Sequence, residues 1–365
     1  MRNTFSYGIA RPDEEAQLRA LMARNPVPGA IQVTYAREPD YMLGCGIMGD
    51  RVQVGVCRKN DNEVVGIAQR SSRMMYYNGH LERVGYLSQL RLDKEYWGQG
   101  LTREGFRYGQ KLHAEGDVRG YITTIIELNE RARAILETPR DPFPHYHDIG
   151  RVYTLALMVR QPKKLSHDID LSYGGNLEEI VEFLNHEGCR RQFFYHYNID
   201  DFSNGRLQGF HLDDLAVARR KGEIIGVLGY WNQSDFKQSI ISNYSLALKL
   251  AKPFYNLYLR AIGGKPLPQA GQKLEHSYAT LCCIKDDEPQ VFEALLNAVY
   301  AIAYERGDAY LMIGIHEKDP LLPIAQAIPH VAYRSRLYAV TWDDEDTGFY
   351  DELDERLPHI EIATL

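Results

Sequence analysis

The stretch Trp97–Thr102 reads Trp-Gly-Gln-Gly-Leu-Thr and separates a strand-like segment from a helix-like one. Residues 87–93 alternate apolar and polar side chains, which is typical of a β-strand, and apolar residues recur at helical spacing from Leu101 on. A glycine turn between a strand and a helix presents backbone N–H groups at the positive end of the helix dipole. Gly98 and Gly100 carry no Cβ that would keep a ligand away. The stretch therefore predicts a binding loop for a phosphate or pyrophosphate.

A second glycine pattern, Gly44–Gly49, has the spacing Gly-x-Gly-x-x-Gly of dinucleotide-binding turns. That motif has to follow a strand and open a helix, because the helix N-terminus faces the pyrophosphate. Here the next residues, 52–56, are strand-like, and no acidic residue stands about 20 positions further on. We therefore interpret residues 44–49 as a loop that binds no dinucleotide.

The chain offers the same order of elements twice. Residues 56–67 and 217–227 share a β-branched run, a basic pair, a polar turn, Glu, two β-branched residues and Gly, which is typical of a β-hairpin. The matching order predicts an internal duplication, interrupted by an insertion at about 232–274. In the first half the predicted elements are a helix after Pro12, strands at 52–58, 63–76 and 83–92, a helix from Leu101, a strand at 118–128, a helix after Asn129 and a strand at 151–160. In the second half they are a helix at 176–187, strands at 213–220, 223–231 and 276–284, a helix at 289–305, a strand at 309–315, a short helix and a strand at 333–341.

The glycine turn resembles the pyrophosphate signature of the GNAT acetyltransferase superfamily, Arg/Gln-x-x-Gly-x-Gly/Ala, which lies between the fourth strand and the third helix of that fold. The inner part, Gly98-Gln99-Gly100-Leu101, fits the signature. Trp97 stands in the basic or amide position and Thr102 in the small one, so one side-chain contact departs from the pattern. The later Asn of the family is matched by Asn129, with Ala132 three residues on.

This resemblance covers about residues 1–160 and, more faintly, the remainder. It implies acetyl-CoA, and hence coenzyme A, as the cofactor. Arg103, Arg131 and Arg133 are further candidates for contacts with the coenzyme phosphates. The cofactor-binding residues that the resemblance implies are Leu90, Arg91, Leu92, Trp97, Gly98, Gln99, Gly100, Leu101, Thr102 and Asn129.

The fold class that the resemblance implies is α/β (α+β), with two tandem GNAT-like domains, each a mixed, mostly antiparallel sheet flanked by helices. We expect a cofactor-binding domain at 1–160, a degenerate copy at 165–342 and an acidic, solvated tail at 343–365. In the second copy the equivalent turn, 281–290, contains no glycine, three carboxylates stand where a pyrophosphate would lie, and Pro289 lacks a backbone donor. The coenzyme is therefore expected in the first domain alone.

Acyl transfer to an amine needs a base for the ammonium proton, a donor for the developing oxyanion and an acid for the leaving thiolate. The resemblance implies backbone N–H groups of Leu90–Leu92 as the oxyanion donor and direct attack without a covalent enzyme intermediate. Many family members carry a Glu where this chain has Ser88, so Glu127 is our choice of base, with Glu82 as the substitute. Tyr146 lies about where the family places a tyrosine near the sulfur, and it is our candidate acid.

Composition narrows the partners. The formal net charge of -7 argues against nucleic acid, and no apolar run approaches the roughly 18 residues of a membrane span. The start of the chain lacks the apolar core of a secretion signal, so we expect a cytoplasmic protein. The five cysteines show no metal-type spacing, and His145 and His147 lack a third ligand, so we expect no metal. The expected partner is an amine on a small molecule or a protein, with no nucleic acid and no membrane, and a homo-oligomer is left open.

Three functions remain open at this point. The first is an N-acetyltransferase whose amine pocket lies at the junction of the two domains. The second is a non-catalytic protein that binds and senses acyl-CoA, which the departures at Ser88 and Trp97 favour. The third is a tandem-GNAT aminoacyl or peptidyl transferase, against which the intact Gly98-x-Gly100 turn counts. The net charge hints at a cationic amine as acceptor.

Overall fold

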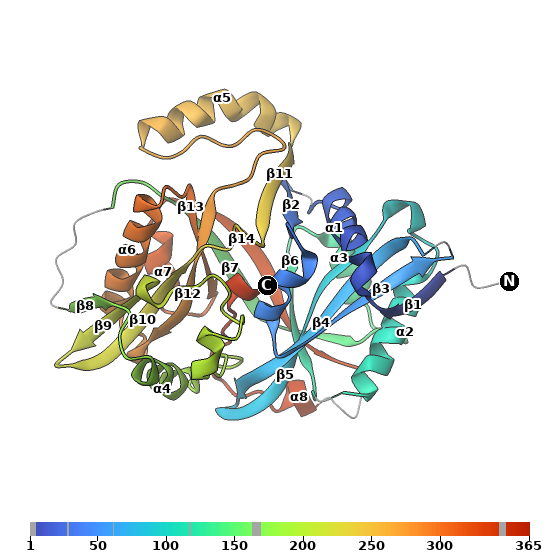
Figure 1. The fold of residues 1–365 in the computed structure, drawn as a ribbon, viewed down its shortest axis with the longest axis horizontal. Coiled ribbons are helices and arrows are strands. Elements are labelled where there is room, and N and C mark those ends of the chain that lie inside the picture. The colour runs from blue at the N-terminus through green and yellow to red at the C-terminus, as the bar shows by residue number, and fades with distance from the viewer. Residues whose placement is uncertain (1–4, 28, 61, 117, 163–168, 343–347) are drawn as a thin grey trace.

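The computed structural model of the chain describes residues 5–27, 29–60, 62–116, 118–162, 169–342 and 348–365 (Figure 1). The elements of the first half are β1 (Phe5–Ile9), α1 (Glu15–Arg24), β2 (Ile31–Ala36), β3 (Arg51–Lys59), β4 (Val64–Tyr77), β5 (His80–Leu92), α2 (Leu101–Ala114), β6 (Tyr121–Ile126), α3 (Glu130–Leu136) and β7 (His145–Met158).

The second half contains β8 (Asp170–Tyr173), α4 (Leu177–Gly188), β9 (Leu215–Arg220), β10 (Glu223–Trp231), β11 (Gln238–Tyr244), α5 (Leu246–Ala261), β12 (His276–Ile284), α6 (Pro289–Glu305), β13 (Tyr310–His316), α7 (Leu322–Gln326), β14 (His330–Thr341) and α8 (Gly348–Asp351). The sequence patterns anticipate most of these elements, whereas β1, β2, β8, β11 and α5 were not predicted. No helix in the described part of the chain is long and apolar enough to cross a membrane.

Twelve strands form one sheet in the order β1-β3-β4-β5-β6-β14-β7-β13-β12-β10-β9-β8. The pairs β5–β6 and β12–β13 are parallel, and the other neighbours are antiparallel. The last strand of each half is exchanged: β14 pairs with β6 of the first half, and β7 pairs with β13 of the second. The main-chain hydrogen bonds of the sheet therefore cross the proposed division at 161–164, which stays a prediction.

The duplication extends to matching irregularities. The register between β4 and β5 shifts at Ile67–Gln69, and that between β10 and β12 shifts at Val227–Gly229. Gln89 on β5 has a φ of 56°, and Leu281 on β12 has a φ of 55°. A bulge with a residue in this region of φ is uncommon for side chains other than glycine, so its occurrence at equivalent places supports two copies of one unit. The expected fold class is confirmed.

Helices cover both faces of the sheet in each half. On β10, Val227 packs into a core cluster with α4, and its neighbour Leu228 packs into a different cluster with α6, because successive strand side chains point to opposite faces. Pro289 opens α6, where a missing N–H leaves no bond unmade, and apolar residues at helical spacing bury the helix. In the first half, α1 packs on Val56, whereas Leu101 of α2 packs beside the next residue, Cys57.

The insertion forms an arm over the junction of the halves (Figure 1). Its strand β11 pairs antiparallel with β2 in a separate small sheet, so that segments about 200 positions apart in the sequence share one ribbon. The following helix α5 turns Leu248, Tyr255 and Leu259 toward the body of the protein. Its outer face, with Leu250 and Phe254, is exposed.

The expectation of a solvated tail is wrong for residues 348–365. Phe349 stacks on Tyr77 with ring centroids 5.2 Å apart, and Ile362 is 7% exposed. A Cβ added at Gly314 of β13 would lie 2.2 Å from Ile362, so this side chain packs directly on the strand. The acidic run that suggested a tail, 343–346, lies outside the described residues, and the apolar residues after it supply a core segment.

We predict that Ile362→Ala lowers the free energy of unfolding by about 2–5 kcal/mol, because the change leaves a cavity against β13. The control is Leu250→Ala on the outer face of α5, where the side chain is 71% exposed, and this change should stay within about 0.5 kcal/mol. Urea unfolding followed by fluorescence measures both. Equal effects of the two substitutions would contradict the packing of the C-terminal segment.

Candidate functional site

The site begins where two parallel strands separate. The pairing between β5 and β6 reaches Tyr86 and Ile122 and does not continue along the rest of β5. On the other side of β5, the register shift leaves Gln89 and Leu90 opposite Ala68 alone, which is a bulge that bends the strand. From Leu87 on, β5 therefore has a free edge toward β6, with main-chain groups available to a ligand.

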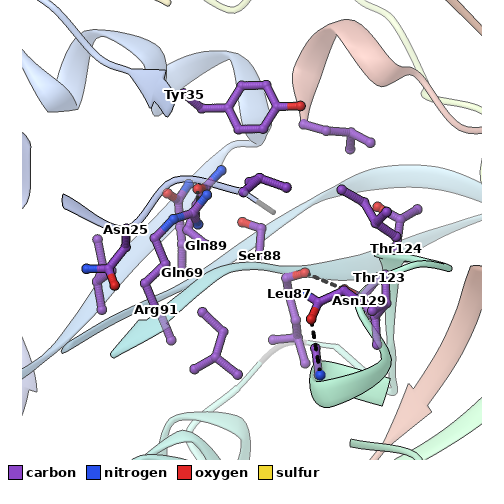
Figure 2. Close-up of a pocket in the computed structure, with 18 of the residues that line it drawn as sticks. Asn25, Tyr35, Gln69, Leu87, Ser88, Gln89, Arg91, Thr123, Thr124 and Asn129 are labelled. Carbon is purple, nitrogen blue, oxygen red and sulfur yellow. Dashed lines mark hydrogen bonds between the residues drawn. The ribbon is translucent and has the colours of Figure 1, made fainter. Parts of the chain in front are cut away.

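A cavity of about 1710 Å³ occupies this gap and continues to the second half of the chain. One end, which we name the turn end, lies at the glycine turn, α2 and α3. The other, the junction end, lies between β2, β5, β11, α5 and β12. Figure 2 shows Leu87 and Ser88 of β5 facing Thr123 and Thr124 of β6, with Asn129 beside them, whereas Gln89 lies on the side of Gln69 and Arg91. The hydroxyl of Thr123 donates to the Leu87 carbonyl at 2.7 Å and ties the strands where they begin to part.

The glycine turn has the backbone that the sequence predicts. Gly98 and Gly100 have φ values of 80° and 77°, in the left-handed region that favours glycine. A Cβ at either position would meet no heavy atom within 4 Å, so the space above the turn is open. α2 starts at Leu101 without a capping side-chain bond in the described part of the chain. The first N–H groups of this helix are thus available to an anion.

Trp97 has a structural role that explains the departure from the signature. Its indole N–H donates to the Leu92 carbonyl at 2.9 Å, which fixes the ring beside the turn. The guanidinium of Arg131, from α3, lies 3.3 Å from the ring centroid, a cation–π contact. A positive charge therefore stands next to the turn even though Trp97 replaces the basic residue.

Asn129 caps α3, as expected, because its side-chain oxygen accepts from the Ala132 N–H at 3.3 Å. This hydrogen bond involves only the side-chain oxygen of Asn129, so its NH₂ group is not used in the cap. Arg103 lines the turn end of the cavity and lies 3.8 Å from a carboxylate oxygen of Asp141. Arg133 does not line the cavity and instead donates to Glu137 at 2.9 Å.

Glu127 is not brought into the cavity. Its neighbours Ile126 and Leu128 line the cavity, whereas Glu127 does not. Its carboxylate accepts from Arg151 Nε at 2.6 Å and lies 3.6 Å from Arg334 Nε. A base has to reach the proton that it removes, so this placement argues against Glu127 in that role. The substitute, Glu82, also lies outside the cavity, 3.9 Å from Arg119.

Ser88 and Tyr146 both line the cavity. The Ser88 hydroxyl is buried and has no hydrogen-bond partner in the described part of the chain, so it is available to a ligand. Tyr146 lies on β7 with its ring against that of Tyr338, at 5.8 Å between centroids. Burial raises the pKa of Tyr146, so the phenol stays protonated at neutral pH and can donate a hydrogen bond.

The junction end contains polar residues that our sequence analysis missed. Lys237 Nζ donates to main-chain oxygens of Ala363 at 3.1 Å and Leu365 at 2.5 Å, and burial lowers its pKa. His276 has Nδ1 2.9 Å from the Leu274 carbonyl and Nε2 3.3 Å from the Tyr278 hydroxyl. Burial lowers the pKa of His276, so the imidazole is neutral near pH 7. A usable signal was present: residues 236–274 contain five lysines and one arginine but no acidic residue.

In the second copy the equivalent gap, between β12 and β13, is filled by the chain itself. The N–H of Leu281, the counterpart of Gln89, donates to Glu361 Oε2 at 2.9 Å, and Ile362 packs beside it on β13. The acidic turn is neutralised, since Asp287 accepts from Arg191 at 2.5 Å and Glu288 pairs with Arg220 at 2.8 Å. These carboxylates do not line the large cavity.

Solved structures share this architecture. The crystal structure of a GCN5-related N-acetyltransferase from Sphaerobacter thermophilus matches over 100% of both chains, with a TM-score of 0.55 and 11% identity. Saccharomyces cerevisiae N-myristoyltransferase with bound myristoyl-CoA matches over 93% of this chain and 83% of its own, with a TM-score of 0.60 and 10% identity. A GCN5-related glucosamine N-acetyltransferase region of a fungal multi-domain GH3 β-N-acetylglucosaminidase matches over 92% of this chain and 38% of its own, with a TM-score of 0.62 and 13% identity.

No protein-family model and no curated protein matches the sequence. Identities of 10–13% establish the fold and nothing finer. The matches span nearly the whole chain. The chain therefore has the GNAT fold in two copies, as the glycine turn and the repeated order of elements predict.

Proposed function

We propose that the protein transfers an acyl group from an acyl-CoA to an amine by direct attack, with the coenzyme held by the first half of the chain. The observation that carries this proposal is one continuous cavity that joins the open glycine turn to a polar pocket at the junction of the halves. An acyl donor and an acceptor could meet in it between β5 and β6. The named activities of the solved structures that share the fold, N-acetyltransferase and N-myristoyltransferase, support the same class of reaction.

In this proposal the pyrophosphate lies on the backbone amides of residues 98–102, where the α2 dipole and the open space above the glycines favour an anion. Arg103 and the Arg131 stacked on Trp97 add positive charge for the phosphates. The pantetheine arm then follows the free edge of β5 and meets the NH₂ group of Asn129.

The chemistry forms a nitrogen–carbon bond and breaks the carbon–sulfur bond of the thioester. The amine first loses a proton to a base, and the developing oxyanion is stabilised by backbone N–H groups of the Leu90–Leu92 segment. His276 is the junction-end group that can take this proton, because burial lowers its pKa and keeps the imidazole neutral near pH 7. The thiolate leaves with a hydrogen bond from Tyr146 and then takes a proton from solvent.

Acetyl-CoA is the donor that we expect, and the acceptor is an amine on a small molecule or a protein. Because one solved structure of this fold contains myristoyl-CoA, the donors tested should run from acetyl-CoA to myristoyl-CoA. If acyl-CoA binds but no thiol is released across a broad panel of amines, the protein is a sensor of acyl-CoA.

We predict that Gly100→Val weakens acyl-CoA binding at least tenfold, because a β-branched side chain is strained at this φ and fills the space of the pyrophosphate. The matched control is Gly222→Val in the hairpin between β9 and β10, where φ is 87° and the surroundings are equally open. Calorimetry should give wild-type affinity for the control. Equal affinity of both variants would remove the assignment of the turn.

The same titration should give one coenzyme per chain. In the second copy, Glu361 and Ile362 occupy the gap between β12 and β13, and the acidic turn is held by arginines. Native mass spectrometry counts the sites independently. Two equivalent coenzymes per chain would contradict the confinement to the first half.

We predict that Tyr146→Phe lowers kcat about tenfold to a hundredfold, with less than about a threefold change in KM for the donor, because the lost hydrogen bond acts on the leaving thiolate. Tyr338→Phe is the control: this ring packs against Tyr146, but its hydroxyl bonds Glu137 outside the cavity. Thiol release measures both. Equal kcat values for the wild type and the Tyr146 variant would exclude this role.

A further inference from the structure

We propose that the acyl acceptor carries an anionic group, a carboxylate or a phosphate, which binds between Arg37 and Arg91 at the junction end of the cavity. This inference rests on the proposed acyl transfer and adds the substrate class. It also replaces the expectation of a cationic amine, which rested on the net charge of the chain, because the carboxylates of the acidic turn at 286–288 lie outside the cavity.

Arg37 is a buried cation with no counter-ion among the described residues. It directly follows β2, is 3% exposed and lines the cavity. Its Nη1 is buried and has no hydrogen-bond partner, and no ion pair to a carboxylate is present within the described ranges. Burying an unpaired guanidinium costs folding free energy unless an anionic ligand pairs with it. The position of Arg37 therefore suits an anion that is bound and released.

Arg91 approaches the same place from β5. Its Nη1 donates to Gln89 Oε1 at 2.9 Å, a neutral partner, and its side chain lines the cavity. Figure 2 shows Arg91 extending with Gln69 and Gln89 toward the side where Tyr35 lies, away from Asn129. Burial and the nearby Arg37 lower the pKa of Arg91, as expected for two guanidinium groups that lie close enough to repel each other.

A further basic side chain, Lys237, lines this end and donates to the main-chain oxygen of Leu365. The β2–β11 register, with Ala36 opposite Gln238, sets Lys237 opposite Arg37. Among the described residues that line the cavity, Asp141 alone has a carboxylate side chain, and it lies beside Arg103 at the turn end. Glu361 faces Lys237 from outside the cavity lining and accepts from the N–H groups of Leu281 and Ala363.

This charge arrangement decides which amines fit. A simple alkylammonium ion would be repelled by Arg37 and Arg91, whereas an anionic group on the same molecule offsets their charge. The guanidinium groups would also lower the pKa of the bound ammonium, which favours the neutral nucleophile. Aromatic rings supply the remaining wall of this end and suit an apolar or aromatic body: Tyr35, Tyr255, Tyr278, Tyr310 and Tyr333.

The experiment uses two matched sets of amines with the full-length protein and acetyl-CoA. The first set is phenylalanine, phenylalaninamide and phenylethylamine, and the second is O-phosphoethanolamine and ethanolamine. Thiol release gives kcat/KM, and calorimetry with desulfo-CoA gives binding without turnover. We expect the anionic member of at least one set to be preferred at least tenfold over its neutral counterpart. The first set reports a carboxylate site, and the second a phosphate site.

Arg37→Gln and Arg91→Gln should each reduce that preference at least tenfold, mainly through KM. Arg70→Gln is the matched control, because Arg70 lines the same cavity but already bonds the Tyr121 hydroxyl at 2.8 Å and Gln53 at 2.7 Å. It should keep the preference. Wild-type protein that binds or uses the neutral amines as well as the anionic ones overturns the proposal, whether or not the variants fold. Binding of anionic amines that depends on Arg37, without thiol release, would support this site while contradicting the enzymatic function.

Discussion

The separation of β5 from β6 after Tyr86 is the constraint on which the rest of the structure depends. A parallel pair that stops pairing leaves main-chain N–H and C=O groups without partners inside the protein, which is costly unless a ligand satisfies them. Three features fix where the two strands separate. They are the bulge at Gln89, the hydrogen bond from Thr123 to the Leu87 carbonyl, and the pairing of β6 with β14 on its other edge. Because β14 comes from the second half, one of these features depends on main-chain bonds between the two halves.

In the second copy, β12 and β13 separate in the same way, but the chain itself fills the gap between them. Leu281 repeats the backbone conformation of Gln89, and β12 leaves β13 in the same manner. There, Glu361 accepts the freed N–H of Leu281, and Ile362 fills the apolar space. The unpaired main-chain groups of the two copies thus find different partners. In the second copy the partner is the C-terminal segment, and in the first copy, in the function that we propose, it is a coenzyme.

The sequence predicts best the elements whose conformation depends on residues that are neighbours in the chain. The glycine turn at Gly98–Gly100, the hairpin at 217–227 and the helix opened by Pro289 need only neighbouring residues, and each forms as expected. The exchange of β7 and β14 between the halves leaves no pattern in neighbouring residues. A strand makes the same kind of main-chain hydrogen bonds with either partner, so its own sequence does not show which partner it takes. The C-terminal segment was misjudged since the acidic run dominated its composition, although Ile360-Glu361-Ile362 alternates as a packed strand-like segment would.

The candidate site likewise has one part that neighbouring residues form and one part that distant segments form. Its turn end lies in consecutive residues and could be read from them, whereas its junction end is assembled from β2, β5, β11 and β12. Arg37 and Lys237 stand 200 positions apart and repel each other, so no contact between them drives their approach. The β2–β11 ribbon brings them together through main-chain bonds, and the 2.6 Å contact between Thr34 and Ser242 adds a side-chain link. Cations held close by a rigid backbone are already arranged for a negative charge before a ligand arrives, which is what electrostatic recognition in a partly dry pocket requires. The insertion that interrupts the duplicated pattern thus supplies the strand that pairs with β2 and holds Lys237 beside Arg37.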